Sequence, residues 1–536
     1  MNQSNARVTT PDRRDLLLAL SIAVLALMVY TRVLAPDVLY SDSGEFQTLA
    51  YTWGMTHTTG YPVYLVLARL VGFIPVNTLA WRINFASAVA AAMTLGGVYL
   101  ITRRFTGRGG AALASLVLLI SYTFWSQSIL AEVYTPATAL IVTVLLMLLG
   151  WHAQPSRRRW LLFLAGFLLG LGLGVHLFMM LIAPSVYLFV LWGIVKGPLE
   201  ERGRWQHLAR LMLGTAAGIV AFYLLFVFID TRPTPTNIFT TSVYPSRDAW
   251  NLQDSDLDTE PERFWINVSG NQWRDRMLPG DVDYLWIFMS FFREDLAREY
   301  TIPTLLLAIL GALAALVQRR RLCALIGLAL VTALAAGLLY FPGDKYIFYL
   351  PVYLLLAVFA GAGAGFLISA AARVLPPTVL RAVPAAIMTV VLVAVCAASL
   401  INTRWQAIQA GRSVFIKEDY AYPVNRPGEP RRVAECAVSK VAESEAYLVL
   451  DWRALYAIYY VAHVEQGRTG LVIRESMPYP THELTGDLRA EIAEQLRKGS
   501  VVYVDRAYPP LGAIYTLTRV GGPCSDYELL RVSLRD

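Results

Sequence analysis

The chain has 536 residues, of which 56% are hydrophobic and only 16% are charged, and its mean hydropathy is +0.48. Soluble domains carry about 25% charged residues, so these values exclude an ordinary soluble protein. Apolar runs of about 20 residues recur along the chain, and they predict a polytopic α-helical membrane protein. The net charge of +7 then needs no nucleic-acid partner, because cytoplasmic loops of membrane proteins collect Lys and Arg.

A polar, Arg-containing tail over residues 1–14 precedes the first apolar run. The positive charge of this tail places the N-terminus in the cytoplasm. We expect a transmembrane domain over residues 15–402 of a multi-pass protein of the cell membrane, with about 11 spans. The apolar runs place these spans near residues 16–34, 81–102, 110–129, 136–151, 160–175, 177–195, 211–229, 302–317, 322–341, 349–371 and 383–401.

Two longer loops interrupt the predicted spans, at residues 36–80 and 230–301. The span count places both loops, and the C-terminal region, on the extracytoplasmic side. In the first loop, residues 44–56 and 61–75 are moderately apolar but contain Gly and Pro. We expect them to form interfacial helices that pack on the bundle.

Residues 403–536 have the composition of a soluble domain. Short apolar runs at residues 446–450, 469–473 and 500–504 predict buried strands, and helices are predicted at residues 431–443, 452–467 and 482–498. This alternation predicts a small extracytoplasmic α/β domain, with no Gly-rich phosphate loop. Cys436 and Cys524 could pair there, since disulfides persist outside the cytoplasm.

Two carboxylates stand three positions apart in the first loop, at Asp42 and Glu45, and no Lys or Arg occurs from residue 33 to residue 68. On a helix the two side chains would share one face. Acids without a local basic partner are candidates for acid/base chemistry or cation binding. The alternative is a solvated helix N-terminus, with Asp42 or Ser43 as its cap.

Other polar residues are predicted on the same face of the membrane, and these are His57, Glu132, His176, Asp344 and Lys345. Glu132 could be a solvated turn residue or could share a cavity with Asp42. His57 and His176 fit a structural role within the bundle better than a catalytic one. The acids could hold a divalent cation through oxygen atoms, although no spacing requires a metal and none fits zinc.

Basic residues on this side suggest that the protein binds an anion. Arginine suits phosphate because its guanidinium offers a bidentate fork, and the alternative is ordinary loop solubility. The candidates are Arg232, Arg247, Arg263, Arg274, Arg276, Arg293 and Lys345.

The first loop resembles that of the DUF2723 family, which includes the TMEM260-like protein O-mannosyltransferases. The matching segments are Asp42-Ser43-Gly44-Glu45-Phe46, Ala50-Tyr51-Thr52-Trp53-Gly54 and His57-Thr58-Thr59-Gly60-Tyr61-Pro62, where the family has two prolines before the glycine. Weaker matches follow in order at Trp81-Arg82-Ile83-Asn84, Ala131-Glu132-Val133-Tyr134, Gly174-Val175-His176 and Asp344-Lys345-Tyr346-Ile347-Phe348-Tyr349-Leu350-Pro351. The resemblance covers residues 15–370.

This resemblance implies a GT-C glycosyltransferase that moves a sugar, with mannose suggested, from a polyprenyl-phosphate donor in the membrane lipid to a hydroxyl of a protein or glycan. Carried over, Asp42 would be the catalytic base, Glu45 would lie beside it, and Glu132 would be the second acid. We expect the other motif residues to contact substrate, namely His57, Tyr61, Arg82, His176, Asp344, Lys345 and Tyr346. No certain cofactor is implied, and a divalent cation remains an open alternative.

Two other functions compete with this one. A transporter or flippase for a lipid-linked or anionic substrate would have charged or broken-helix positions at mid-span. A non-catalytic assembly or sensory protein would use the α/β domain as a binding module. A GT-C enzyme should instead bring its acids together at the outer edge, beneath the soluble domain.

Overall fold

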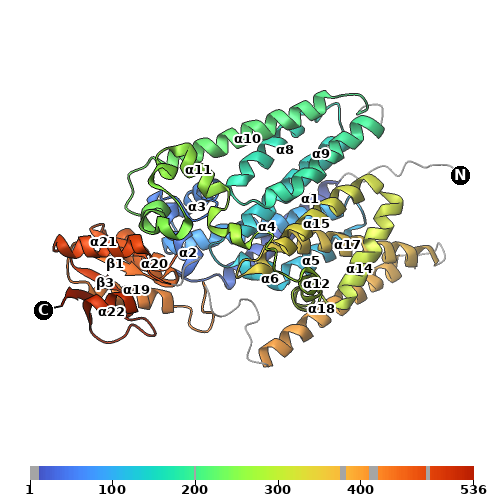
Figure 1. Cartoon of the computed structure of the whole chain (residues 1–536). Coiled ribbons are helices and arrows are strands. Elements are labelled where there is room, and N and C mark those ends of the chain that lie inside the picture. Colours follow the sequence, from blue (N-terminus) through green and yellow to red (C-terminus); the bar gives the residue numbers. More distant parts are fainter. Residues whose placement is uncertain (1–10, 198–200, 375–381, 410–420, 479–482, 536) are drawn as a thin grey trace.

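The computed structural model describes residues 11–197, 201–374, 382–409, 421–478 and 483–535. Figure 1 shows a large bundle of helices with a smaller domain, drawn in orange and red, against one end of it. The short helix α2, drawn in blue, lies where the two parts meet. This junction positions most of the candidate functional residues.

Seven helices of the described chain are long and apolar enough to cross a membrane. They are α1 (Arg13–Arg32), α4 (Leu79–Thr102), α7 (Tyr134–Ala153), α9 (Phe178–Lys196), α10 (Gln206–Asp230), α15 (Arg320–Leu339) and α17 (Leu350–Val374). The predicted polytopic helical class is confirmed.

Two further pairs of apolar helices meet at sharp bends. Helices α5 (Arg108–Leu119) and α6 (Tyr122–Ser128) meet at 68°, and the segment Tyr284–Glu299 meets α14 (Ile302–Gln318) at 105°. That segment comprises α12 (Tyr284–Ser290), η6 (Phe291–Leu296) and α13 (Ala297–Glu299). Two other predicted spans are shorter apolar helices, Trp160–Gly174, which joins α8 (Trp160–Leu171) to η1 (Gly172–Gly174), and Ile387–Ser399 within α18 (Ala382–Gln409).

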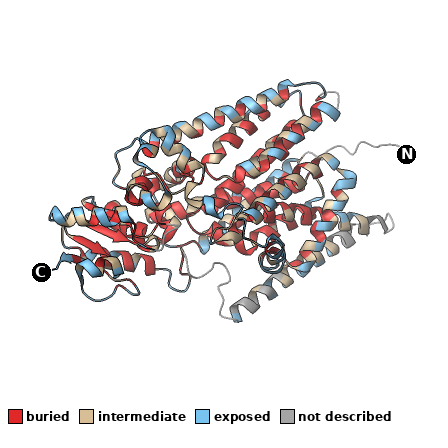
Figure 2. Cartoon of the chain, viewed as in Figure 1, coloured by how far each residue is buried: buried red, intermediate tan, exposed pale blue. Residues whose placement is uncertain are grey.

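The first loop forms α2 (Ser41–Thr52) and α3 (Pro62–Gly72). Helix α2 differs from the predicted interfacial helix, because its residues from Ser43 to Ala50 are all buried. Figure 2 shows this burial at the junction of the bundle and the domain. Helix α3 keeps an apolar exposed face that includes Leu67 and Leu70, as an interfacial helix does.

The loop over residues 230–301 folds into short helices that cover the first loop. They begin with η2 (Phe239–Val243), η3 (Tyr244–Trp250), η4 (Asp254–Leu257), α11 (Glu260–Val268) and η5 (Asn271–Arg276). The Ile238 amide donates to the Met55 carbonyl at 2.9 Å, and Asn267 Nδ2 donates to the Thr56 carbonyl at 3.2 Å. These contacts fix the segment that precedes His57.

The C-terminal domain is a five-stranded sheet covered by helices, in the strand order β2-β1-β3-β5-β4. Its elements are α19 (Glu429–Lys440), β1 (Ala446–Leu450), α20 (Trp452–Tyr459), η8 (Tyr460–Glu465), β2 (Leu471–Glu475), α21 (Gly486–Arg497), β3 (Val502–Val504), α22 (Pro509–Ile514), β4 (Tyr515–Arg519) and β5 (Leu530–Leu534). Strands β2, β1 and β3 are parallel and match the three predicted strands, whereas β5 runs antiparallel to β3 and β4. The predicted strand at 469–473 lies two residues too early.

Polar contacts dock this domain onto the first loop of the bundle. Arg431 Nη2 donates to Asp37 Oδ1 at 2.7 Å, and the same guanidinium also pairs with Glu465 at 2.8 Å. Thr48 Oγ1 donates to the Tyr456 carbonyl at 3.0 Å, which ties α2 to α20. The domain is therefore held directly above α2.

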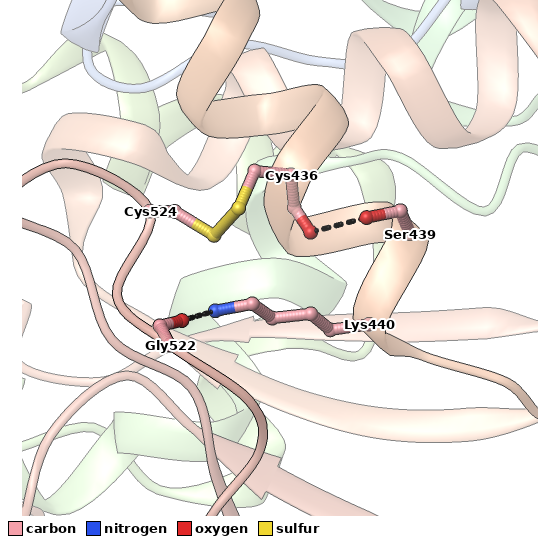
Figure 3. Close-up of a disulfide and its surroundings, with 5 residues drawn as sticks. All are labelled: Cys436, Ser439, Lys440, Gly522 and Cys524. Carbon is pink, nitrogen blue, oxygen red and sulfur yellow. Dashed lines mark hydrogen bonds between the residues drawn. A yellow bond between two sulfur atoms is a disulfide. The ribbon is translucent and has the colours of Figure 1, made fainter.

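A disulfide joins Cys436 on α19 to Cys524, 88 residues further along the chain (Figure 3). Beside it, the Lys440 amine donates to the Gly522 carbonyl, and Ser439 Oγ donates to the Cys436 carbonyl at 2.8 Å. These contacts tie the turn between β4 and β5 to α19. The other two cysteines, Cys323 and Cys396, are buried in the bundle and unpaired.

Candidate active site

Asp42 lies in the first turn of α2, and the turn before this helix is fixed from both sides. Gln47 Oε1 accepts from the Leu39 amide at 2.9 Å, and Gln47 Nε2 donates to Asn84 Oδ1 on α4 at 2.7 Å. A Cβ on Gly44 would lie 2.5 Å from the Leu39 carbonyl oxygen, so this close turn requires glycine. The position of the Asp42 carboxylate thus follows from the packing of α2 on α4.

His57 lies between the two carboxylates of α2. Its Nδ1 is 2.5 Å from Glu45 Oε2, and its Nε2 is 3.9 Å from Asp42 Oδ2. The Glu45 side chain is fully buried, whereas the Asp42 side chain keeps 33% of its surface exposed. Asp42 is therefore the acid of this pair that a substrate can reach.

The charges of these three residues depend on one another. Burial raises the pKa of Glu45, although the His57 charge opposes this effect. Burial also disfavours a charged His57, but Glu45 and Asp42 overcome this and raise its pKa to about 9. Near neutral pH, His57 therefore carries a proton between the two acids.

Glu132 lies between α6 and α7 and is only 8% exposed, which excludes a solvated turn residue. Ser43 Oγ donates to its Oε1 at 3.3 Å. Burial, together with the nearby charges of Asp42 and Asp344, raises the pKa of Glu132 well above its usual value. Burial therefore favours the protonated form of this side chain, and a protonated carboxyl can donate a hydrogen bond.

Aromatic contacts connect His57 to His176. The Tyr61 ring lies 5.3 Å from His57 and is stacked, at 6.1 Å and 2°, on His176. The Phe178 amide donates to His176 Nδ1 at 3.1 Å. Burial lowers the pKa of His176 to about 3, so this ring is neutral.

The predicted Asp344 and Lys345 lie at α16 (Lys345–Phe348), and Asp344 is close enough to act electrostatically on Glu132. Lys345 Nζ is buried 3.9 Å from the centre of the Phe341 ring and has no hydrogen-bond partner among the described residues. Burial lowers the pKa of Lys345 to about 8. This amine is available to a ligand that brings negative charge.

Two arginines that the sequence did not single out stack on tyrosines near α16. Arg298 lies 5.4 Å from the Tyr122 ring centre and 5.7 Å from that of Tyr346, and Arg404 lies 4.9 Å from Tyr122. Helices α6 and α13, which lie at the bends after α5 and before α14, are in contact. Neither arginine follows a motif, so no sequence signal could have found them.

Several predicted arginines make contacts of a structural kind. Arg263 forms an ion pair with Asp230 at 2.8 Å. Arg82 donates to the Ile74 and Thr78 carbonyls, at 2.9 and 3.2 Å. Arg274 donates to Ser269 Oγ at 3.0 Å, and Arg232 stacks on Phe228 at 4.2 Å and on Trp53 at 5.3 Å.

Trp452, at the start of α20, also reaches the site from the soluble domain. Its Nε1 donates to Asp42 Oδ1 at 2.8 Å. The two residues are 410 positions apart, and nothing in the local sequence indicates their contact.

Metal ligation was an open alternative for the acids. Within the described ranges, no three or more His, Cys, Asp or Glu side chains are grouped so that they could hold a metal ion.

Comparison with known proteins adds to this geometry. Residues 42–197 match the family model described as the protein O-mannosyl-transferase TMEM260 N-terminal domain. The predicted resemblance to the TMEM260-like family is confirmed. Two relatives are the TMEM260 protein O-mannosyl-transferases of Mus musculus, 26% identical over 211 residues, and of Dictyostelium discoideum, 24% identical over 219 residues. The matches cover 38% and 37% of this chain but only 30% and 26% of those proteins.

Solved structures match nearly the whole chain. ArnT from Cupriavidus metallidurans bound to undecaprenyl phosphate has a TM-score of 0.58 at 14% identity, covering 96% of this chain and 97% of ArnT. The Archaeoglobus fulgidus oligosaccharyltransferase has a TM-score of 0.51 at 13% identity, covering 91% of this chain and 69% of that enzyme. Both are glycosyltransferases, and the predicted GT-C-like fold class is confirmed.

Proposed function

We propose that the protein is a membrane glycosyltransferase that moves a sugar from a polyprenyl-phosphate donor to a hydroxyl group of a protein or glycan on the extracytoplasmic face. The observation that carries this proposal is the convergence of Asp42, Glu45, His57 and Glu132 beneath the soluble domain. Asp42 is partly exposed there, whereas the other acids are buried.

In this reaction the Asp42 carboxylate accepts the proton of the acceptor hydroxyl. The hydroxyl oxygen then bonds to the anomeric carbon, and the bond from that carbon to the phosphate oxygen breaks. The polyprenyl phosphate leaves with the electron pair, and the single displacement inverts the anomeric configuration. Protonated Glu132 donates a hydrogen bond to a substrate oxygen.

The leaving phosphate needs positive charge, and Lys345, Arg298 and Arg404 are the candidates to supply it. Arg298 and Arg404 stack on Tyr122, and Lys345 lies over the Phe341 ring. Guanidinium groups suit phosphate oxygens. The similarity to ArnT, whose structure is bound to undecaprenyl phosphate, supports a polyprenyl phosphate as the lipid carrier.

The extracytoplasmic placement of the site is supported by the Cys436–Cys524 disulfide, because such bonds persist outside the cytoplasm. The names of the mouse and slime-mould relatives favour mannose as the sugar and protein as the acceptor.

The test is transfer of radiolabelled sugar from a panel of polyprenyl-phosphate sugars in membranes, with wild type compared with Asp42→Asn. We expect transfer from one donor by wild type and a loss of about 100-fold or more in the variant. The matched control is Asp281→Asn, at an exposed acid of the second loop. Unchanged transfer by well-expressed Asp42→Asn would remove Asp42 as the base, and no transfer by wild type from any donor would favour the transporter.

A further inference from the structure

Trp452 brings the soluble domain into direct contact with the candidate catalytic carboxylate. Its indole Nε1 donates to Asp42 Oδ1 at 2.8 Å. The same indole packs edge-to-face against His57, with ring centres 5.8 Å apart and an interplanar angle of 88°. Trp452 thus touches two of the three residues at the centre of the site.

The structure around Trp452 fixes the indole. Asp451 Oδ1 caps α20 by accepting from the Arg453 amide at 3.0 Å, and the Asp451 amide donates to Asp505 Oδ2 at 3.0 Å. Arg506 pairs with both of these acids, at 2.5 and 3.2 Å.

Packing along the helices fixes it further. The Tyr456 ring packs edge-to-face on Trp452 at 5.3 Å. A Cβ on Gly44 would lie 3.5 Å from the Ala457 amide nitrogen, so α2 and α20 are in close contact. The backbone at Trp452 and one side of its ring are therefore held in place beside α2.

We propose that Trp452 is a positioning residue for Asp42, and that the soluble domain is in this way a required part of the catalytic centre. The inference rests on the proposed function. The indole N–H donates but cannot accept, so it holds Oδ1 of an ionised carboxylate. Oδ2, which faces His57 at 3.9 Å, is left to receive the proton of the acceptor hydroxyl.

The match to known families does not assign this role. The family model ends at residue 197, and Trp452 lies in the domain beyond it. Without this contact, the soluble domain would be expected only to cover the site or to bind the acceptor. The hydrogen bond from Trp452 to Asp42 brings a side chain of the domain into contact with the candidate catalytic carboxylate.

Trp452→Phe tests the proposal because it keeps an aromatic ring but removes the N–H donor. We expect kcat to fall about 10- to 100-fold, with the KM for the donor within about twofold of wild type. The matched control is Trp205→Phe, at an indole that is 59% exposed beside α10.

Wild-type kcat in a folded Trp452→Phe protein would overturn the proposal. A rise in the KM for the donor as large as the fall in kcat would also overturn it, since it would indicate a packing role. If Trp452→Phe does not fold, Trp452→Tyr serves the same purpose, because the phenol hydroxyl stands farther from Cβ than the indole nitrogen does.

A double-mutant cycle separates this proposal from the proposed function. Thermal unfolding is measured for Trp452→Phe, Asp42→Ala and the double variant, without any assay of transfer. Coupled, less-than-additive losses of stability are expected for a direct contact, and additive losses would refute it. Absence of sugar transfer by wild type would instead refute the proposed function.

Discussion

The Glu45 carboxylate binds His57 at two points. Oε2 lies 2.5 Å from the ring Nδ1, and Oε1 accepts from the His57 backbone amide at 2.8 Å. One buried carboxylate thus orients both the imidazole and the segment that carries it. Glu45 is therefore best assigned to positioning His57, which leaves Asp42 to meet the substrate.

The pH dependence of stability follows from this pair. The pKa of His57 rises from 6.5 to about 9 on folding, through Glu45 and Asp42. Because the folded protein binds the proton more tightly, this stabilisation is complete below about pH 6.5 and is lost as the pH rises through about 9. We expect the thermal midpoint of wild type to fall over this window.

Glu45→Gln removes the negative partner of His57. The thermal midpoint of this variant should be lower than that of wild type at pH 6 and should change less as the pH rises. Midpoints are measured from pH 6 to pH 10 for the two proteins at equal ionic strength. Parallel curves for wild type and Glu45→Gln would contradict a charged His57–Glu45 pair.

Glu132 should tolerate replacement by a neutral polar side chain but not by an apolar one. Because burial and the nearby acids raise the pKa of Glu132 and so favour its neutral form, Glu132→Gln is expected to keep the transfer rate within about threefold of wild type. Glu132→Leu removes the hydrogen bond to Ser43 and any bond to substrate, and should lose about 10- to 100-fold. Steady-state transfer rates at pH 7 distinguish the two, and an inactive Glu132→Gln protein would show that the ionised form is needed.

The sequence predicted those features whose signal is a long apolar run or lies within a few neighbouring residues. Apolar runs of about 20 residues located the seven long helices, whereas the other four of the 11 predicted spans are sharply bent helix pairs or shorter apolar helices. Asp42 and Glu45 stood out because the chain around them lacks Lys and Arg. Strands β4 and β5 were missed because their partly exposed positions give no continuous apolar run.

The remainder of the site depends on tertiary structure. The Trp452–Asp42 contact spans 410 positions, and Arg298 on α13 stacks on Tyr122 of α6, which is distant in the sequence. The local sequence around Glu132 is compatible with either a solvated or a buried side chain, and packing in the folded protein buries it.

Loss of the tyrosine-stacked arginines should weaken donor binding more than chemistry. Arg298→Gln and Arg404→Gln each remove a guanidinium beside Tyr122, and charged hydrogen bonds to phosphate contribute about 1.5–3 kcal/mol. We expect the KM for the polyprenyl-phosphate donor to rise about 10-fold or more. Arg320→Gln, at an exposed arginine at the start of α15, is the control, and an unchanged donor KM in both variants would exclude these residues from phosphate binding.

Removal of the disulfide should lower the stability of the soluble domain, and the transfer rate should fall as a consequence. Cys436 and Cys524 close a loop of 88 residues, and loss of a native bond of this kind costs about 2–5 kcal/mol. Cys436→Ser is expected to lower the thermal midpoint and the transfer rate together, because α19 packs beside α20, which carries Trp452. Cys323→Ser, at a buried cysteine of the bundle, provides the control under the same conditions. If Cys436→Ser loses stability but keeps the full transfer rate at low temperature, the domain reaches Asp42 without the covalent link.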